Sequence, residues 1–252
     1  MKRTALVLSA GGMFGAYQAG AWRALSEFWQ PDVVIGASVG SLNGWAIAGG
    51  CTPAALIDRW LRLTDASTHR FHLPRRFEDG LIVAEPFVQW VREVYDSYQP
   101  LRPYGVVITD LLKLKPVMVM TPGITWRHLA ASCAVLGMLP QQRIDGRLYT
   151  DGGLMGALPL WAAAEAEADV VIGVNVLRNI PRALRTVITG LRSLGPSIPE
   201  LPPSIRSTVI GPEGYLGDPR DAIYWNRDKA SRWIDQGYED VLRQKHFLKE
   251  LF

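Results

Sequence analysis

The sequence predicts an α/β layered protein with a mostly parallel central sheet. Short apolar segments alternate with helical patterns through the first 180 residues, as is typical of α/β folds. The predicted strands are 4–8, 33–35, 105–109, 116–120 and 170–176, and the predicted helices include 15–28 and 39–48. The later strands are apolar without polar alternation, which indicates parallel strands covered on both faces. Ligands of such folds bind beyond the carboxyl ends of the strands, so the residues that follow each strand are the first site candidates.

Length and composition fit one large globular domain or two small ones, and we expect a single domain over residues 1–252. Of 252 residues, 48% are hydrophobic and 20% are charged, which excludes disordered, collagen-like and coiled-coil chains. A net charge of +3 is too small to require a nucleic-acid partner, and we expect none. The two cysteines, Cys51 and Cys133, and the four scattered histidines show no metal-ligand spacing. We therefore expect neither a metal nor an organic cofactor.

The N-terminal residues are similar to a secretory signal only in part. Lys2 and Arg3 precede an apolar stretch at residues 5–8, which is shorter than the roughly 7–15 residues of a signal's hydrophobic region. Glycines follow at once, where a signal would carry its cleavage site. No apolar run approaches the roughly 18–20 residues that cross a bilayer. A buried first strand is the favoured interpretation, and we expect a cytoplasmic protein with the option of peripheral membrane contact.

The C-terminal region is predicted to contain an irregular loop followed by a long helix. Ten of the 25 residues at 195–219 are Gly or Pro, which predicts a loop. Residues 227 to about 249 follow a helical pattern after Asn226, a suitable N-cap, so the helical region is taken as 226–250. Its apolar positions share roughly one face: Ala230, Trp233, Ile234, Gly237, Val241 and Leu248. We expect this helix to pack on the core rather than to form a separate domain.

The strongest local motif is a G-x-S-x-G sequence formed by Gly36, Ser38 and Gly40. It follows the predicted strand 33–35 and leads into the predicted helix 39–48. This strand-turn-helix setting strains the serine backbone and exposes its hydroxyl as a nucleophile. The adjacent helix N-terminus also favours developing negative charge. The alternative is a chance match in a glycine-rich chain, but the flanking elements favour a nucleophilic Ser38.

A second glycine-rich segment, residues 10–15, also lies between a predicted strand and a predicted helix. It reads Ala-Gly-Gly-Met-Phe-Gly, and its consecutive glycines allow backbone N–H groups to converge on one anion. The anion is either a phosphate or the oxyanion of an acyl-transfer intermediate. A dinucleotide site would need G-x-G-x-x-G and an acidic residue after the second strand. Ala10 replaces the first glycine and Asp32 precedes that strand, so the dinucleotide interpretation is the weaker one.

The third motif is Asp151 followed by two glycines, Gly152 and Gly153. An isolated Asp-Gly is usually only a turn, but an activated serine needs a base, and Asp151 is the candidate. A histidine base is the alternative, and only His246 follows the acid in the chain order of α/β-hydrolases. It lies in a charged run that is typical of an exposed helix face. The remaining histidines fit surface or helix positions: His69, His72 and His128.

Together the three motifs resemble those of the patatin-like phospholipase family, of the bacterial type, and occur in the same order. That family carries a glycine-rich oxyanion loop, a G-x-S-x-G serine and a D-G-G or D-G-A aspartate more than a hundred residues later. Here Ser38 and Asp151 are 113 residues apart (151 − 38). Two further segments are similar to the family: Thr109-Asp110-Leu111 with Pro116-Val117, and Ala131-Ser132-Cys133-Ala134 with Leu139-Pro140. The resemblance covers about residues 4–177.

The resemblance implies a three-layer α/β/α sandwich that hydrolyses lipid acyl esters through a Ser–Asp dyad. Ser38 would be the nucleophile and Asp151 its base, with an acyl-enzyme as intermediate. The N–H groups around Gly11, Gly12 and Met13 would form the oxyanion hole. The glycines that would support the motifs are Gly15, Gly36, Gly40, Gly152 and Gly153. Two rivals stay open: a catalytically idle lipid-binding or regulatory module, and an acyltransferase, which normally needs a histidine beside the serine.

The predicted oxyanion loop departs from the family pattern at two positions. The family usually has three glycines and then a basic residue before the last glycine, whereas this chain has Ala10 and Phe14 there. We expect less positive potential and more apolar surface at the mouth of the site, which favours simple esters or neutral lipids over phospholipids. Backbone amides do not need the missing side chain. An aspartate of ordinary pKa is a weak base for a hydroxyl, so oxyanion stabilisation would carry much of the acceleration.

Two basic segments are candidates for membrane contact. The segment from Arg59 to Arg76 carries five arginines with apolar residues between them, where the family often places a cap over its site. The segment from Arg182 to Leu194 places apolar residues on one helical face and arginines away from it, as in membrane-surface helices. The competing interpretation of this second segment is a surface helix packed on the core. Trp22 is interpreted as core or pocket lining, like the other tryptophans.

Overall fold

The computed structural model describes residues 2–63, 73, 76, 78–83, 85–178, 190 and 195–251. Within these ranges the strands are β1 (Thr4–Leu8), β2 (Val33–Ala37), β3 (Tyr104–Asp110), β4 (Lys115–Met120), β5 (Gln142–Ile144), β6 (Arg147–Thr150), β7 (Val170–Val174) and β8 (Arg206–Ile210). The α-helices there are α1 (Gly15–Ser26), α2 (Val39–Ala48), α3 (Pro53–Arg62), α4 (Glu85–Ser97), α5 (Trp126–Ser132), α6 (Trp161–Glu165) and α8 (Arg227–Lys249). Short 3-10 helices are η1 (Gly12–Phe14) and η3 (Pro219–Ala222).

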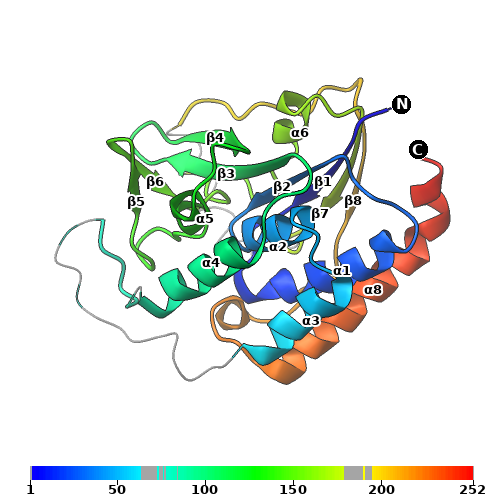
Figure 1. Ribbon diagram of the computed structural model, residues 1–252, viewed down its shortest axis with the longest axis horizontal. Helices are drawn as coiled ribbons and strands as arrows, with labels where there is room; N and C mark the ends of the chain where they lie inside the picture. The colour runs from blue at the N-terminus through cyan, green and yellow to red at the C-terminus, as the bar shows by residue number, and fades with distance from the viewer. Residues whose placement is uncertain are drawn as a thin grey trace.

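These strands form one sheet in the order β5-β6-β3-β2-β1-β7-β8, with β4 paired to β3. The strands β3, β2, β1, β7 and β8 run parallel to one another, whereas the pairs β3–β4, β3–β6 and β5–β6 are antiparallel. The carboxyl ends of the parallel strands therefore face one edge of the sheet (Figure 1). Ligands bind at this edge in such sheets, so the segments that follow the parallel strands hold the site candidates.

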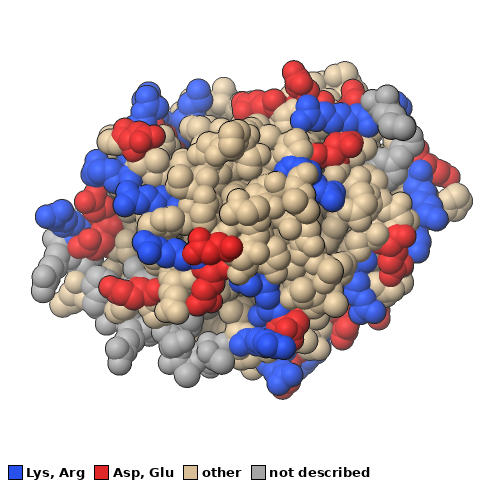
Figure 2. Space-filling view, viewed as in Figure 1, with Lys and Arg blue, Asp and Glu red and all other residues tan. Residues whose placement is uncertain are grey.

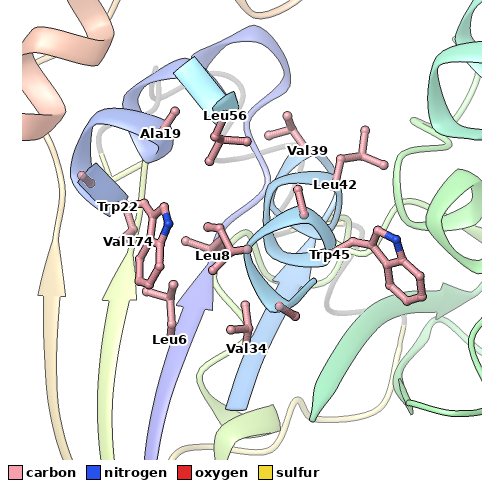
Figure 3. Close-up of a cluster of buried hydrophobic side chains, with 14 of the residues drawn as sticks. Leu6, Leu8, Ala19, Trp22, Val34, Val39, Leu42, Trp45, Leu56 and Val174 are labelled. Atoms are coloured by element: carbon pink, nitrogen blue, oxygen red, sulfur yellow. The ribbon is translucent and has the colours of Figure 1, made fainter. Parts of the chain in front are cut away.

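The side chains of β1 alternate between two apolar clusters on the two faces of the sheet. Leu6 and Leu8 belong to the larger cluster, which includes residues of α1, α2, α3, α4, α5 and α8. Ala5 and Val7 belong to the smaller cluster, which includes residues of α6 and of the segment 198–205. Figure 3 shows part of the larger cluster, and its two labelled tryptophans are buried there as predicted. The sheet is thus the middle of three layers.

The C-terminal helix α8 packs along α1 (Figure 1). Asn226 caps it by accepting the Lys229 N–H at 2.9 Å, and all six predicted apolar positions are buried. The two helices come close because each has a glycine at the contact. A Cβ added to Gly20 or to Gly237 would overlap a backbone carbonyl of the opposite helix. The helix therefore belongs to the core of the molecule.

Two predictions about strands are wrong. The run at 116–120 lies in β4, which pairs antiparallel with β3 and is only partly buried, rather than forming a parallel strand covered on both faces. Four residues join β3 to β4, whereas a parallel pair needs a crossover of about a dozen. The loop predicted at 195–219 contains β8, a parallel neighbour of β7. Since β8 is half exposed at the sheet edge, it lacks the continuous apolar run of a buried strand.

Charged residues of both signs are mixed on the face shown in Figure 2, around a broad uncharged area. The described arginines of the first basic segment already have partners: Arg59 lies over the ring of Tyr98, Arg62 pairs with Asp58, and Arg76 pairs with Glu78. Its other arginines lie outside the described residues, as does the segment 182–194 apart from Gly190. In the part of the chain that the structure describes, no helix has both the length and the apolar character to span a bilayer.

Candidate active site

Ser38 lies at the carboxyl end of β2, in the sharp turn that leads into α2. Its backbone has φ 53° and ψ −131°, a strained conformation for a residue with a side chain. The Ser38 N–H donates to the Ser132 hydroxyl at 2.8 Å, and the Ser41 hydroxyl donates to the Ser38 carbonyl at 2.6 Å. Ser132 donates in turn to the Val107 carbonyl at 2.7 Å. Hydrogen bonds from α5, α2 and β3 therefore hold the strained turn in place.

Two glycines allow this turn to lie against the end of β1. A Cβ on Gly36 would overlap the Gly40 carbonyl, and a Cβ on Gly40 would overlap the carbonyls of Leu8 and Ser9. No side chain fits at either position without moving backbone. The turn that carries Ser38 is consequently in contact with the start of the glycine-rich loop, which follows β1.

Asp151 follows β6 and is buried. Its N–H donates to the Ala134 carbonyl at 3.0 Å, and its carbonyl accepts from the Thr109 hydroxyl at 2.9 Å. Its side chain accepts the Gly153 N–H at 2.7 Å through Oδ1. Burial raises the pKa of Asp151 from 3.8 to about 6, and outweighs the lowering effects of the Ser38 side chain and the Gly153 N–H.

The side chains of Ser38 and Asp151 interact although they are 113 residues apart in the sequence. The nearby Ser38 hydroxyl lowers the pKa of Asp151, while Oδ2 of Asp151 has no hydrogen bond of favourable geometry to any described residue. Catalytic hydrogen bonds are often long or poorly aligned before substrate binds. The Cys133 thiol lies beside Ser38 and Asp151, and 3.9 Å from the Ser41 hydroxyl. Burial and the charge of Asp151 raise the pKa of this thiol. Oδ2 is thus the Asp151 oxygen that has no hydrogen bond to a described residue.

The glycine-rich loop follows β1 and forms η1. The Ala10 N–H donates to the Ala157 carbonyl at 2.8 Å, so it is used within the fold. The next three N–H groups, those of Gly11, Gly12 and Met13, donate to no acceptor in the ranges that the structure describes. These are the three groups that the family resemblance implies for the oxyanion hole. Consecutive unpaired amides in a turn form a site for an anion.

The two unusual residues of this loop are both enclosed by protein. Ala10 contacts the Asp151 motif, because a Cβ on Gly153 would overlap the Ala10 Cβ. Phe14 is buried, and its ring meets the Trp233 ring of α8 edge-on with centroids 5.0 Å apart. The expectation that Phe14 adds apolar surface at the mouth of the site is therefore wrong. Its ring instead joins the loop to the core beside α8.

No histidine among the described residues hydrogen-bonds to Ser38. His128 belongs to the capping box of α5, where its Nδ1 accepts the Thr125 N–H at 3.0 Å. His246 is exposed in the last turns of α8, 3.5 Å from Glu250. His69 and His72 lie outside the described residues. The buried carboxyl of Asp151 is therefore the base candidate that the described geometry favours.

Sequence reasoning missed several residues that support the site. Ser132 lies in a segment noted only for its family resemblance, yet it holds the Ser38 turn. A chain of buried side chains lies beneath the loop: Gln18 donates to the Ser9 carbonyl at 2.7 Å, Asn43 donates to Gln18 at 2.9 Å, and Trp60 donates to Asn43 at 3.0 Å. Buried polar groups need such partners. Uncharged polar residues within apolar helical segments are the sequence signal that could have found Gln18 and Asn43.

Two hollows of the structure lie away from Ser38. One of about 700 Å³ is formed by the segment 215–221 and α8, and one of about 10 Å³ lies between α2, α3 and α4. The predicted site residues line neither of them. Within the described ranges, no three or more His, Cys, Asp or Glu side chains are grouped so as to hold a metal ion.

The mostly parallel sheet between helical layers, with its glycine-bearing motifs gathered at one sheet edge, places the molecule in the patatin-like class of α/β folds. The chain belongs to the patatin-like phospholipase family, whose model matches residues 6–164. The matched region contains the glycine-rich loop, the Ser38 turn and the Asp151 motif. Helix α8 lies beyond it.

Several curated proteins are similar to this chain. An uncharacterised NTE family protein of Mycobacterium tuberculosis is 32% identical over 182 residues, which is 69% of this chain. Patatin-like phospholipase domain-containing protein 7 of Rattus norvegicus is 29% identical over 184 residues, and lysophospholipase nte1 of Aspergillus oryzae is 28% identical over 178 residues; each match covers 68% of this chain. The matches cover 49%, 13% and 12% of these relatives, respectively.

Among solved structures, VipD from Legionella pneumophila is similar over 96% of this chain and 66% of its own, with a TM-score of 0.56 and 11% identity. A likeness at this identity shows a shared fold. It confirms the prediction of a patatin-like α/β architecture.

Proposed function

We propose that this protein is a serine hydrolase of lipid acyl esters, of the phospholipase A, lysophospholipase or esterase type, with Ser38 as nucleophile and Asp151 as base. One observation carries the proposal: a serine with φ 53° has its hydroxyl beside a buried carboxyl whose pKa is raised to about 6. Backbone strain and buried titratable pairs are costly to a fold and concentrate at active sites. Family membership and the lysophospholipase among the relatives support a lipid substrate.

In the acylation step, Asp151 accepts the Ser38 hydroxyl proton while the serine oxygen attacks the ester carbonyl carbon. The carbonyl oxygen becomes an oxyanion, and the N–H groups of Gly11, Gly12 and Met13 stabilise it. When this intermediate collapses, the bond to the alcohol oxygen breaks and the leaving alcohol takes the proton from Asp151. An acyl group remains bonded to the oxygen of Ser38.

In the deacylation step, water attacks the acyl carbon while Asp151 accepts one of its protons. The second intermediate collapses, its bond to the Ser38 oxygen breaks, and that oxygen recovers the proton. The free fatty acid then leaves. The raised pKa makes Asp151 a stronger base than an ordinary aspartate, and the group is still mostly ionised at neutral pH. This offsets part of the weakness that the sequence predicts for an aspartate base.

The two rival functions have less support from the described contacts. An idle lipid-binding module has no use for a strained serine that faces a buried carboxyl, since both features destabilise a fold. An acyltransferase normally places a histidine beside its serine, and no described histidine hydrogen-bonds to Ser38. Retained activity after substitution of all four histidines would count further against the acyltransferase.

The proposal is tested by hydrolysis of p-nitrophenyl butyrate and of lysophosphatidylcholine. We expect Ser38→Ala and Asp151→Asn each to lower kcat/KM by roughly 10⁴- to 10⁶-fold, the range found when residues of a serine hydrolase's catalytic machinery are removed, with unchanged circular dichroism. Ser231→Ala and Asp235→Asn, at exposed positions of α8, are the matched controls and should keep full activity. Full activity of either site variant would exclude the dyad. A wild-type protein that binds lipid without cleaving either ester would favour the idle module.

A further inference from the structure

The turn between β3 and β4 carries an exposed leucine at the sheet edge that holds Ser38. Because β2 and β3 are parallel, Ser38 and the turn residues 111–114 follow strands that end at the same edge (Figure 1). Leu112 in this turn is 85% exposed. Single exposed apolar side chains are common on proteins. The residues around Leu112 are therefore needed to show whether this side chain belongs to a binding surface.

The backbone of this turn is tightly held. Asp110 is buried, and its Oδ1 accepts the N–H groups of Leu112 and Lys113 at 3.2 and 3.1 Å. The Leu111 N–H donates to the Leu148 carbonyl of β6 at 2.9 Å. Leu112 is consequently presented on a preorganised backbone, and burying it in a partner would require little additional ordering.

Three cations surround Leu112. Lys113 and Lys115 are exposed, and so is Arg147, the residue before Leu148, whose carbonyl accepts the Leu111 N–H of the turn. None of the three forms an ion pair with a described residue. The exposed acid of the adjoining β5–β6 turn is Asp145. The buried Asp110 is the second acid of the group, so three cations and two acids leave a formal charge of +1 (3 − 2), which attracts an anionic surface.

The same region is joined to the candidate base. Thr109, one residue before Asp110, donates to the Asp151 carbonyl at 2.9 Å. The exposed Val135 follows Ala134, whose carbonyl accepts the Asp151 N–H at 3.0 Å. Two exposed apolar side chains, those of Leu112 and Val135, therefore lie on the segments that hold Asp151. A surface docked on this turn would lie close to the candidate site.

We infer that Leu112, Lys113, Lys115 and Arg147 form an interfacial tip that docks this edge of the sheet on an anionic lipid bilayer. Leu112 enters the boundary between head groups and acyl chains, and the three cations contact anionic head groups. The inference rests on the proposed function, because the docked edge is the one that carries Ser38. It names the lipid surface on which that site would act.

Vesicle co-sedimentation tests the tip, in a Ser38→Ala background that leaves the lipid intact. We expect tighter binding to mixed phosphatidylcholine–phosphatidylserine vesicles than to phosphatidylcholine alone. Lys113→Glu with Lys115→Glu should weaken binding to mixed vesicles by more than about tenfold, since each cation contributes roughly fivefold. Leu112→Asn should weaken it by about fivefold.

The controls lie at the opposite edge of the sheet. Leu101, 78% exposed and just before β3, is matched to Leu112, so Leu101→Asn should bind as the parent does. Lys2→Glu with Lys249→Glu repeats the charge change before β1 and at the end of α8, and should weaken binding less than twofold, as expected for charges away from the lipid surface. Equal losses in tip and control variants, equal binding to both kinds of vesicle, or no binding would overturn the inference.

A fluorescent label reports insertion directly and separates this inference from the proposed reaction. Cys51 and Cys133 are buried, so Leu112→Cys and Leu101→Cys each accept one polarity-sensitive label. The emission of the label at 112 should shift to the blue on mixed vesicles and that of the label at 101 should not; the reverse would contradict the inference.

In the enzyme that retains Ser38, the tip variants should hydrolyse soluble p-nitrophenyl acetate at the parent rate. A loss there would show that the tip residues act in the reaction rather than in docking.

Discussion

Ser38 and Asp151 each occupy a state that an isolated residue avoids. Ser38 has φ 53°, and burial raises the pKa of Asp151 to about 6. Each such feature costs a fold roughly 1–3 kcal/mol. Neighbours without reactive roles maintain both states, since Ser132 accepts the Ser38 N–H and Gly153 donates to Asp151. At the scale of the residue, stability and activity are therefore expected to oppose each other.

The raised pKa of Asp151 predicts how activity depends on pH. The ionised carboxylate is the base, so kcat/KM for a soluble ester should fall about tenfold per pH unit below about pH 6 and level off above it. The measurement is a pH–rate profile with circular dichroism at each pH to show that the protein remains folded. A profile that stays flat to about pH 4.5 would contradict the assignment of Asp151 as the base.

The same pKa predicts that Asp151→Asn stabilises the fold. The folded state holds the Asp151 proton more tightly than the unfolded chain, so the ionised group opposes folding above about pH 6, and this penalty disappears below about pH 4. A rise from 3.8 to about 6 corresponds to about 3 kcal/mol, which is an upper bound. Urea unfolding should show Asp151→Asn more stable than wild type at about pH 8, with a smaller difference near pH 4.

The exposed Asp235→Asn is the control for this measurement, because its carboxylate is hydrated in both states. It should show no comparable change in the free energy of unfolding between the two pH values. The gain in free energy of unfolding that Asp151→Asn gives over wild type should be larger at the higher pH. An equal or smaller gain there would contradict the inference that the buried, ionised carboxylate destabilises the fold.

At the scale of the element, the glycine-rich loop depends on the C-terminal part of the chain. A Cβ on Gly12 would overlap the Ala222 carbonyl of η3, and Phe14 packs on Trp233 of α8. The Trp225 indole N–H also donates to the Trp60 carbonyl of α3 at 3.1 Å. These contacts come from residues beyond the region 6–164 that the family model matches. The C-terminal elements therefore help to position the proposed oxyanion hole.

Gly12→Ala should lower activity much more than it lowers stability. Gly12 has φ 55° and no room for a Cβ, so the loop must shift and its amides must move, which should lower kcat by about 10²-fold or more. Gly137→Ala is the matched control, since Gly137 has φ 78° but no neighbour within 4 Å. Both substitutions carry a similar backbone penalty of roughly 1 kcal/mol. If Gly12→Ala and Gly137→Ala had equal kcat values at equal thermal stability, the position of the glycine-rich loop would have no role in the reaction.

At the scale of the whole molecule, the sequence predicts best the elements that are buried on both sides. The strands β1, β2, β3 and β7 and the helices α1 and α2 were predicted within two residues at most of their ends, because continuous apolar runs and flanking glycines mark them. Strands at the sheet margins were harder. β8 is half exposed, β5 and β6 are three and four residues long, and β4 reverses direction through a four-residue turn.

The site was predictable where chemistry is local and unpredictable where it depends on contacts distant in sequence. The turn of Ser38 and the loop of Gly11 have motif signatures that follow from backbone geometry. Ser132 and Trp233 have none, because their roles arise only when α5 and α8 pack against these motifs. Phe14 shows the same limit. A phenylalanine in the loop at the mouth of the site predicts exposed apolar surface there. In the fold, Phe14 is instead buried against α8.

The central claim is that Ser38 forms a covalent bond to the acyl group with Asp151 as its base. Intact-protein mass spectrometry after treatment with a fluorophosphonate tests it most directly, because the reagent bonds only to an activated serine. We predict one adduct on the wild-type protein, mapped to the peptide that contains Ser38, no adduct on Ser38→Ala, and much slower labelling of Asp151→Asn. An adduct on a different serine, or equally fast labelling of Asp151→Asn, would contradict the claim.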